Sequence, residues 1–300
     1  MPNRNTERLA DELKQIDHSL EIEIWPDIKN PDTVEFAVVW YHPQNELLKF
    51  PNLKAISSYG AGVDHILSDS GLPAQVPFAR IVAPTLVEEM NEYVLTAILN
   101  HKRRFTDFKL QQSNRLWKPY SKRNGINVGI MGLGQLGSAL AQYLLNFGFI
   151  VKGWSQSKKL IKNVACYDKQ SLDDFLIDLD YLVCLLPLTN ETEHILNTDL
   201  FKRCHNKPYL INVARGKHLN ESDLIAALNF GQISGVCLDV FVEEPLPANH
   251  PFWQDERILI TPHVAAVTDV SEAAQQIVEN YRRMRQSQPL INEVNREKGY

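Results

Sequence analysis

Cysteine is scarce in this 300-residue chain, and long apolar runs and any large excess of charge are missing. The four cysteines stand singly without a CxxC pair, which argues against a zinc site or a disulfide framework. The longest apolar stretch, Tyr181–Leu188, is far shorter than the ~20 residues that a membrane helix requires. Basic residues number 31 and acidic residues 36, so no bulk positive field exists to bind nucleic acid. Because the N-terminal segment is also too polar for a secretory signal, we expect a cytoplasmic protein.

The length corresponds to about two domains of ordinary size. Eight apolar runs have the length and composition of strands, and amphipathic helical patterns lie between them. Such alternation is typical of βαβ units, in which helices cover both faces of a parallel sheet, so an α/β fold is predicted. The predicted strands are Glu35–Trp40, Leu53–Ser57, Asn127–Met131, Phe149–Trp154, Tyr181–Leu186, Tyr209–Val213, Ser234–Val240 and Ile258–Thr261.

Two longer helical patterns, about Val87–Leu110 and Asp269–Gln286, bracket six of these strands. The tail after the bracket, about 30 residues, is too short to fold alone and is expected to pack on the N-terminal part. Basic clusters at His101–Arg104 and Arg282–Arg285 are expected on solvent-exposed faces of the two helices. The predicted domains are a contiguous one over residues 93–269 and a discontinuous one over residues 1–92 and 270–300.

A glycine-rich segment follows the strand predicted over Asn127–Met131 and opens the next helical pattern. It reads Gly132-Leu133-Gly134-Gln135-Leu136-Gly137, the GxGxxG spacing of dinucleotide-binding turns. In such turns the first glycine permits the tight bend, the second lets the backbone approach a pyrophosphate, and the third lets helix and strand pack closely. The pyrophosphate binds to the free N–H groups at the start of the helix. The segment therefore predicts a Rossmann-type coenzyme domain.

The residue at the end of the following strand indicates which coenzyme binds. Sites for NAD carry a carboxylate there for the ribose hydroxyls, whereas this chain has Ser155, followed by Gln156, Ser157, Lys158 and Lys159. Serine hydroxyls and ammonium groups favour a 2′-phosphate, which a carboxylate would repel. We therefore predict NADP(H) as the preferred coenzyme and leave NAD(H) open. The alternative is that the two lysines belong only to a solvated turn.

Three polar side chains follow the last three predicted strands: Arg215, Glu244 and His263. The ligand crevice of an open α/β sheet lies outside the carboxyl ends of its strands, so the three can converge on one substrate. Arginine can bind a carboxylate and polarise a carbonyl, and histidine can donate a proton. Glutamate can hold the second imidazole nitrogen and favour its charged form. Glu243 is the alternative to Glu244 for this role.

Segments spread over nearly the whole chain resemble the D-2-hydroxyacid dehydrogenase family. In family order they are Tyr59-Gly60-Ala61-Gly62-Val63-Asp64, the GxGxxG turn, Asn212-Val213-Ala214-Arg215-Gly216, Leu238-Asp239-Val240-Phe241 through Glu244-Pro245, and Thr261-Pro262-His263. Within the family the chain is most similar to the glyoxylate/hydroxypyruvate reductase A branch. The segments that carry this similarity are Val39-Trp40, Trp154-Ser155, Glu244-Pro245-Leu246-Pro247 and Pro262-His263-Val264-Ala265-Ala266.

The resemblance implies a Rossmann coenzyme-binding domain inserted into a discontinuous flavodoxin-like substrate domain, and a homodimer formed through the coenzyme domain. Arg215, Glu244 and His263 match the catalytic trio of the family, and Asp239 matches the position that contacts the nicotinamide end. The coenzyme contacts expected on this basis are Gly132, Gly134, Gln135, Leu136, Gly137, Ser155, Gln156, Ser157, Lys158, Leu186, Pro187, Val213, Ala214, Arg215, Asp239, His263 and Ala265.

A small pocket for a carboxylate substrate is predicted around the first family segment. Gly60, Ala61 and Gly62 can present backbone N–H groups to the carboxylate, and Trp40 and Tyr59 can wall the pocket, although such aromatics are also typical of a core. We predict an NADPH-preferring reductase of small 2-oxo acids, which converts glyoxylate to glycolate and hydroxypyruvate to D-glycerate. The alternatives are another 2-hydroxyacid dehydrogenase, such as an NADH-linked D-lactate type, and a nucleotide-sensing binding protein of the same fold.

Overall fold

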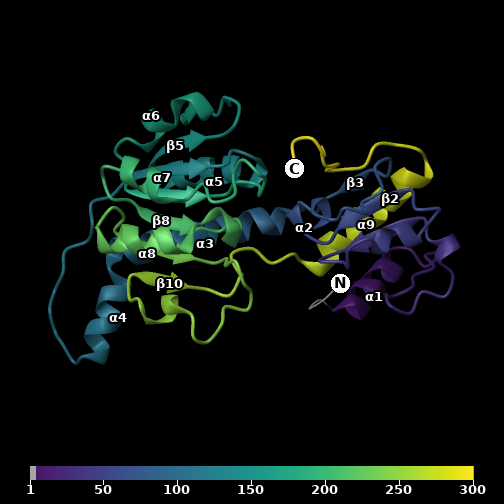
Figure 1. Cartoon of the computed structure of the whole chain (residues 1–300), viewed down its shortest axis with the longest axis horizontal. Coiled ribbons are helices and arrows are strands. Elements are labelled where there is room, and N and C mark those ends of the chain that lie inside the picture. The colour runs from purple at the N-terminus through teal and green to yellow at the C-terminus, as the bar shows by residue number, and fades with distance from the viewer. Residues whose placement is uncertain (1–4, 300) are drawn as a thin grey trace. The chain divides into compact units, whose positions relative to one another are not determined.

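The computed structural model describes residues 5–299, which form two units (Figure 1). The inserted unit comprises residues 87–266, and the split unit combines residues 5–86 with residues 267–299. Each unit contains a parallel sheet with helices packed on it. The predicted fold class, an α/β chain with one domain inserted into a discontinuous second one, is therefore confirmed.

The described part of the inserted unit builds one parallel sheet of seven strands, in the order β10-β9-β8-β7-β4-β5-β6. The first six strands along the chain follow the order of a dinucleotide-binding fold, and β10 adds a further strand at one edge. The direction of strand order reverses at β4, between its neighbours β5 and β7. The strands are β4 (Asn127–Met131), β5 (Ile150–Trp154), β6 (Ala165–Tyr167), β7 (Tyr181–Cys184), β8 (Tyr209–Asn212), β9 (Gly235–Leu238) and β10 (Ile258–Ile260).

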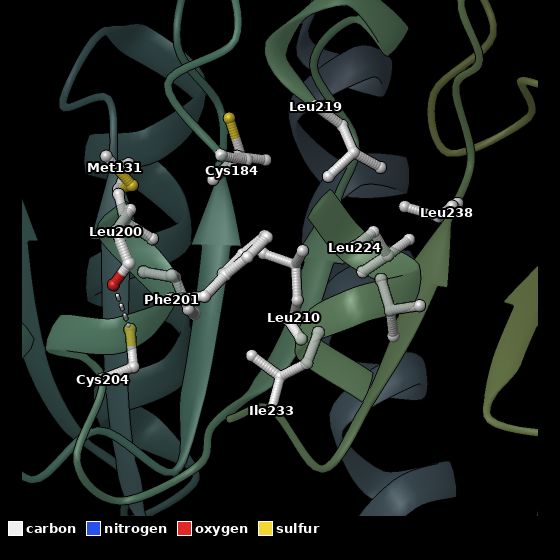
Figure 2. Close-up of a cluster of buried hydrophobic side chains, with 14 of the residues drawn as sticks. Met131, Cys184, Leu200, Phe201, Cys204, Leu210, Leu219, Leu224, Ile233 and Leu238 are labelled. Atoms are coloured by element: carbon white, nitrogen blue, oxygen red, sulfur yellow. Dashed lines mark hydrogen bonds between the residues drawn. The ribbon is translucent and has the colours of Figure 1, made fainter. Parts of the chain in front are cut away.

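Apolar side chains from both faces of this sheet are buried under helices. Along β7, for example, Leu182 and Cys184 belong to one cluster, whereas Tyr181 and Val183 belong to the other. The first cluster, drawn in Figure 2, packs under α6 (Leu172–Leu176), α7 (Thr198–Arg203) and α8 (Glu221–Asn229). The second packs under α3 (Pro84–Arg103) and α5 (Gln135–Asn146). Burial on both faces explains why these strands are apolar almost throughout.

The split unit has a smaller parallel sheet in the order β1-β2-β3. Its C-terminal helix α9 packs against both α1 and β2, so the tail completes the N-terminal part as predicted; in Figure 1 yellow α9 lies beside purple α1. Asp269 begins α9 by accepting a hydrogen bond from the Glu272 N–H, at 2.9 Å. The elements are α1 (Thr6–Ile16), β1 (Phe36–Val39), β2 (Ala55–Ser58), α2 (Asp64–Leu67), β3 (Phe78–Ala79) and α9 (Val270–Arg285).

The structure differs from the sequence expectations in several places; the short strand β3, for example, is not among the predicted strands. The helix expected over about Val87–Leu110 is two helices, α3 and α4 (Phe105–Ser113), because Arg104 has a φ of +63° and ends the first. The short strand β6 is not among the predicted strands either. Its three residues are exposed or partly exposed, so its apolar signal in the sequence is weak. His101 does not lie on a solvated face: its ring is largely buried and stacks on Tyr209 with 4.0 Å between ring centroids.

Candidate active site

The glycine turn follows β4 at the point where the strand order reverses. Gly132 has a φ of +106°, and a Cβ there would lie 2.5 Å from the carbonyl oxygen of Leu185. A Cβ on Gly137 would lie 1.8 Å from the carbonyl oxygen of Gly132, so the helix can pack this closely only with glycine. Around Gly134, by contrast, a Cβ would meet nothing within 4 Å. The turn thus leaves open space beside its middle glycine, where a ligand could approach the backbone.

The N-terminus of α5 opens toward this space. Gly134 is its N-cap and supplies no side-chain hydrogen bond, and no acidic residue stands in the first turn, which includes Gln135 and Leu136. The first N–H groups of a helix have no partners within the helix, and they carry the positive end of its dipole. A pyrophosphate therefore fits the turn by charge and by the space available.

The loop after β5 carries the residues predicted to face the coenzyme ribose. Ser155 is buried and its hydroxyl donates to the Ser157 carbonyl at 2.8 Å, which fixes the start of the loop. Gln156 is exposed and donates a 2.8 Å hydrogen bond from Nε2 to Glu191 Oε2. Lys158 is exposed and borders a hollow of about 610 Å³ that residues 158–162 and 164–167 line. The hydroxyl and ammonium groups expected for a 2′-phosphate thus lie on one loop.

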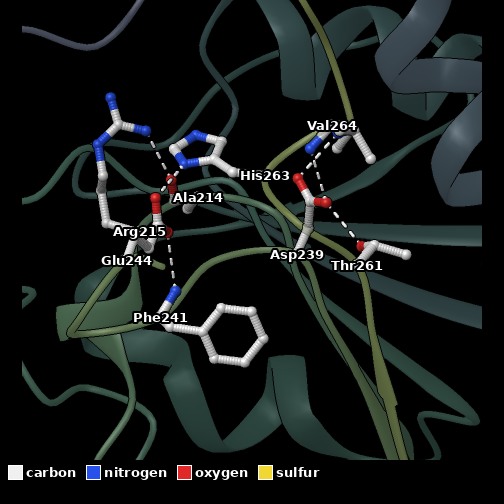
Figure 3. A network of polar contacts seen from close by, with 9 residues as sticks. Ala214, Arg215, Asp239, Phe241, Glu244, Thr261, His263 and Val264 are labelled. Carbon is white, nitrogen blue, oxygen red and sulfur yellow. Dashed lines mark hydrogen bonds and ion pairs between the residues drawn. The ribbon is translucent and has the colours of Figure 1, made fainter. Parts of the chain in front are cut away.

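Arg215, Glu244 and His263 lie beyond the carboxyl ends of β8, β9 and β10, three neighbouring strands. His263 Nδ1 lies 2.7 Å from Glu244 Oε2, and Glu244 Oε1 accepts a 3.0 Å hydrogen bond from the Phe241 N–H. Arg215 donates from Nη1 to the carbonyl of Ala214 at 2.6 Å. Figure 3 shows the guanidinium and the imidazole on the same side of the Glu244 carboxylate. The imidazole and the carboxylate are about one third exposed, 36% and 34%, so a ligand can reach them.

The carboxyl group of Glu244 is held in its ionised form. Partial burial alone would raise its pKa, but the hydrogen bond with His263, the Phe241 N–H and the charge of Arg215 together lower the pKa below its usual 4.5. Glu243, the alternative from the sequence, is not the residue that contacts His263. A carboxylate at this position orients the imidazole and stabilises its protonated form.

Asp239 holds the turn that carries His263 (Figure 3). Its buried carboxylate accepts hydrogen bonds from the Thr261 hydroxyl at 2.6 Å, the Val264 N–H at 2.9 Å and the Ala265 N–H at 2.8 Å. Its backbone carbonyl accepts from the His263 N–H at 2.9 Å. His263 itself has a φ of +55°, a conformation that a non-glycine residue keeps only where its surroundings fix it. The Asp239 carboxylate therefore positions His263, and its contact with the nicotinamide end of the coenzyme stays a prediction.

Two further residues support the site and carry no signal in the sequence. His218 is fully buried, and its Nδ1 lies 3.2 Å from the backbone nitrogen of Arg215. The hydroxyl of Tyr93, on α3, lies 2.5 Å from the Thr261 hydroxyl and 3.3 Å from Cys237 Sγ. Desolvation raises the pKa of Tyr93 well above its usual range, so its hydroxyl keeps its proton. Tyr93 is 168 positions from Thr261 in the sequence, whereas His218 is only three positions from Arg215 and differs from other histidines only by its burial, so no local motif reveals either residue.

The remaining predicted coenzyme contacts lie on the loops that follow β7, β8 and β10. Four of these side chains are buried, so they would meet a ligand mainly through their backbone. Pro187 contributes a carbonyl that accepts from the Thr192 hydroxyl at 2.6 Å. The buried residues are Leu186, Val213, Ala214 and Ala265.

The predicted substrate contacts belong to the split unit and follow β1 and β2. Tyr59 is buried, and a Cβ on Gly60 would lie 2.6 Å from the partly buried Trp40 ring, so Gly60 packs closely against that ring. The Gly60 N–H donates to the Ser58 hydroxyl at 3.3 Å. Ala61 and Gly62 are partly exposed, so their backbone is the part of the segment that a small anion can reach.

Comparison with known proteins places the chain in a family. Residues 95–265 match the family model "D-isomer specific 2-hydroxyacid dehydrogenase, NAD binding domain". A glyoxylate/hydroxypyruvate reductase A of Yersinia enterocolitica is 40% identical over 274 residues, which cover 89% of this chain and 88% of the relative.

The chain is also similar over its full length to solved structures. A D-isomer specific 2-hydroxyacid dehydrogenase of Xanthobacter autotrophicus, in complex with NADPH and MES, has a TM-score of 0.94 at 36% identity, and 100% of this chain and 98% of that chain are covered. An NADPH-dependent glyoxylate/hydroxypyruvate reductase of Sinorhizobium meliloti, in complex with NADP and sulfate, has a TM-score of 0.92 at 35% identity, with 99% and 98% covered. The chain belongs to the D-isomer specific 2-hydroxyacid dehydrogenase family.

Proposed function

We propose that this protein is an NADPH-preferring reductase of small 2-oxo acids, which converts glyoxylate to glycolate and hydroxypyruvate to D-glycerate. The observation that carries the proposal is the 2.7 Å contact between Glu244 and His263, with Arg215 facing the same carboxylate. A cationic fork and a proton donor on neighbouring strand ends are the groups that reduction of a 2-oxo acid requires. The reductases of Yersinia enterocolitica and Sinorhizobium meliloti support the choice of substrate.

Each member of the trio has a distinct role in this proposal. Arg215 binds the substrate carboxylate and polarises the carbonyl group at C2. His263, as imidazolium, gives its proton to the carbonyl oxygen as that oxygen gains negative charge, and in the reverse direction it removes the proton from the hydroxyl. Glu244 orients His263 and stabilises its protonated form. The reduced coenzyme, when bound, supplies the hydride that C2 accepts.

The chain's own residues also fit the coenzyme. Gly134 and the N–H groups at the start of α5 would hold the pyrophosphate. Ser155 and Lys158 would face the 2′-phosphate of NADP(H), and no carboxylate occupies the end of β5 that NAD sites use for the ribose hydroxyls. The NADPH and NADP in the complexes from Xanthobacter and Sinorhizobium support this preference, and NAD(H) remains a second coenzyme to compare.

The two units divide these roles. We assign coenzyme binding to the predicted domain over residues 93–269 and substrate binding to the predicted domain over residues 1–92 and 270–300. In the substrate domain, the backbone N–H groups of Ala61 and Gly62 are proposed to bind the carboxylate of the acid, as an anion-binding nest would. Trp40 backs this segment through the close approach of its ring to Gly60, and the Tyr59 side chain is buried.

We also propose that the protein forms a homodimer through its coenzyme domain. Apolar side chains are exposed on α4 and the segment after it, with Trp117 fully exposed and Phe105 and Leu116 mostly so. Contiguous exposed apolar groups of this kind mark an interface. Trp117→Ser should shift the mass measured by light scattering from two chains toward one; an unchanged dimeric mass, or a monomeric wild type, would contradict the assignment.

A cytoplasmic location is part of the same proposal. Every cysteine is unpaired, as in proteins of reducing compartments. No helix within residues 5–299 is long and apolar enough to cross a bilayer.

The test is an NADPH-oxidation screen with glyoxylate, hydroxypyruvate, pyruvate and longer 2-oxo acids, repeated with NADH. The proposal predicts the highest kcat/KM for glyoxylate or hydroxypyruvate with NADPH. A preference for pyruvate with NADH would instead indicate a D-lactate type of dehydrogenase. Tight NADPH binding with negligible oxidation by every acid would indicate a nucleotide sensor.

A further inference from the structure

A hydrogen bond joins two loops that are 35 positions apart in the sequence. Gln156 on the loop after β5 donates from Nε2 to Glu191 Oε2 on the loop after β7, at 2.8 Å, and both side chains are exposed. Neither Gln156 nor Glu191 has a role in the proposed transfer of the hydride and the proton. The bond brings a carboxylate to the loop whose hydroxyl and ammonium groups are expected to receive the 2′-phosphate.

The contact crosses the carboxyl end of β4, where the glycine turn begins. Strands β5 and β7 pair with β4 on its two sides, with Met131 opposite both Trp154 and Cys184. Neighbouring strands lie about 4.8 Å apart, so the two loops start roughly 10 Å apart and the Gln156–Glu191 pair bridges that gap. In an open α/β sheet this is the crevice in which the dinucleotide lies.

Both loops are braced, so the position of Glu191 is set by the fold. Thr192, the next residue, donates from its hydroxyl to the Pro187 carbonyl at 2.6 Å and accepts from the Thr189 N–H at 2.9 Å. On the other side, the Ser155 N–H donates to the Tyr167 carbonyl at 3.1 Å. The carboxylate therefore stands on a fixed turn opposite the ribose loop.

We propose that Glu191 is a coenzyme-specificity residue, whose carboxylate opposes the 2′-phosphate and limits the preference for NADP(H) over NAD(H). The inference rests on the proposed coenzyme site and adds a residue to it. Lys158 and Lys159 attract the phosphate, whereas Glu191 repels it, and Gln156 is a neutral link that cannot offset that charge. The preference for NADP(H) over NAD(H) is then set by the balance between the attraction of the two lysines and the repulsion of Glu191.

The test compares Glu191→Gln with the wild-type protein by calorimetric titration of 2′,5′-ADP and 5′-AMP, so that it does not depend on turnover. The variant removes the charge and keeps the size of the side chain. Because two like unit charges about 5–8 Å apart in water interact by roughly one RT, and the 2′-phosphate carries up to about two charges, we expect 2′,5′-ADP to bind about 3- to 7-fold more tightly and 5′-AMP to gain nothing. The gain should shrink in 0.5 M salt, since exposed charges are screened.

Glu193→Gln is the matched control, because Glu193 lies on the same loop and its carboxylate faces Lys217, with 4.0 Å between Nζ and Oε1. It changes the net charge equally and should leave the ratio of the two affinities within about two-fold. An unchanged 2′,5′-ADP affinity in Glu191→Gln, or equal gains for both nucleotides, would overturn the inference. If the fragments behave as expected but no 2-oxo acid is reduced, the proposed reaction fails while the role of Glu191 stands.

Discussion

The hydroxyl of Thr261 donates a 2.6 Å hydrogen bond to Oδ1 of Asp239, and this contact ties the end of β10 to the end of β9. The same carboxylate accepts from the N–H groups of Val264 and Ala265, the two residues that follow His263. Because His263 is in the left-handed region, with a φ of +55°, the turn depends on these bonds to keep its shape. The orientation of His263, the proposed proton donor, is thus fixed by a buried network of hydrogen bonds.

Thr261→Val removes the hydroxyl at nearly constant volume and should misplace His263 without disturbing the glycine turn. We expect kcat for glyoxylate reduction to fall about 10-fold, since catalysis is sensitive to small misplacements of a catalytic group. The Kd of NADPH should stay within two-fold, and Thr261→Ser should restore kcat because it keeps the hydroxyl. A Thr261→Val enzyme with wild-type kcat, or a Thr261→Ser enzyme as slow as Thr261→Val, would show that the network does not position His263.

Glu244→Gln removes the negative charge beside His263 while a side chain of the same size remains. The lowered pKa of Glu244 means that the wild-type carboxylate is ionised at every pH above about 4.5 and stabilises the imidazolium throughout that range. Without that charge, His263 loses the electrostatic partner that orients its ring. The kcat/KM for glyoxylate reduction with NADPH should therefore fall about 10-fold, while the Kd of NADPH stays within two-fold.

Glu243→Gln is the control for Glu244→Gln, because Glu243 is the neighbouring carboxylate and is not the residue that contacts His263. It removes the same charge and should leave kcat/KM for glyoxylate within about two-fold of the wild-type value. Equal losses in the two variants, or a Glu244→Gln enzyme with wild-type kcat/KM, would contradict the role of Glu244.

His101 provides a test of stability against pH. Burial, with the charge of Arg123 adding to it, lowers the pKa of His101 from 6.5 to about 4, and neither ring nitrogen has a hydrogen-bond partner among the described residues. The folded protein holds this ring neutral, whereas the unfolded chain binds a proton below about pH 6.5. The contribution of the neutral ring to the free energy of unfolding is therefore fully present above about pH 6.5 and is lost as the pH falls toward 4. At pH 5 the loss is about 2 kcal/mol.

His101→Phe keeps the stack on Tyr209 and removes the titrating group. The free energy of unfolding in urea should fall about 2 kcal/mol less between pH 7 and pH 5 in this variant than in the wild type. His205→Gln, at an exposed position after α7, is the comparison. Equal losses for wild type and His101→Phe would mean that the buried imidazole is not a source of acid sensitivity.

Much of the layout could be predicted from local sequence signals. The apolar strands of the inserted unit, such as Tyr181–Cys184, are buried on both faces, so their composition alone identifies them. Likewise, the glycine turn is recognised because its spacing reflects backbone geometry at Gly132 and Gly137. The family resemblance supplied the roles of the trio, and the geometry adds that Glu244, not Glu243, contacts His263.

What the sequence did not reveal depends on burial and tertiary contacts. Tyr93 reaches Thr261 from a helix 168 positions earlier, and His218 holds Arg215 through a buried ring that looks like any other histidine in the sequence. His101 lies within a basic cluster, which predicts exposure, yet its ring is buried against Tyr209. Burial and pairing of this kind are set by tertiary packing, and no periodicity or spacing in the chain encodes them.

The central claim is that His263 delivers the proton while Arg215 holds the acid. The most direct test is the single-turnover rate of NADPH oxidation at saturating glyoxylate, measured by stopped flow for the wild type and for His263→Asn. The proposal predicts a rate about 10²- to 10⁴-fold lower in the variant, with the Kd of NADPH within two-fold of the wild-type value. A variant rate within three-fold of the wild type would contradict the assignment of His263 as the proton donor.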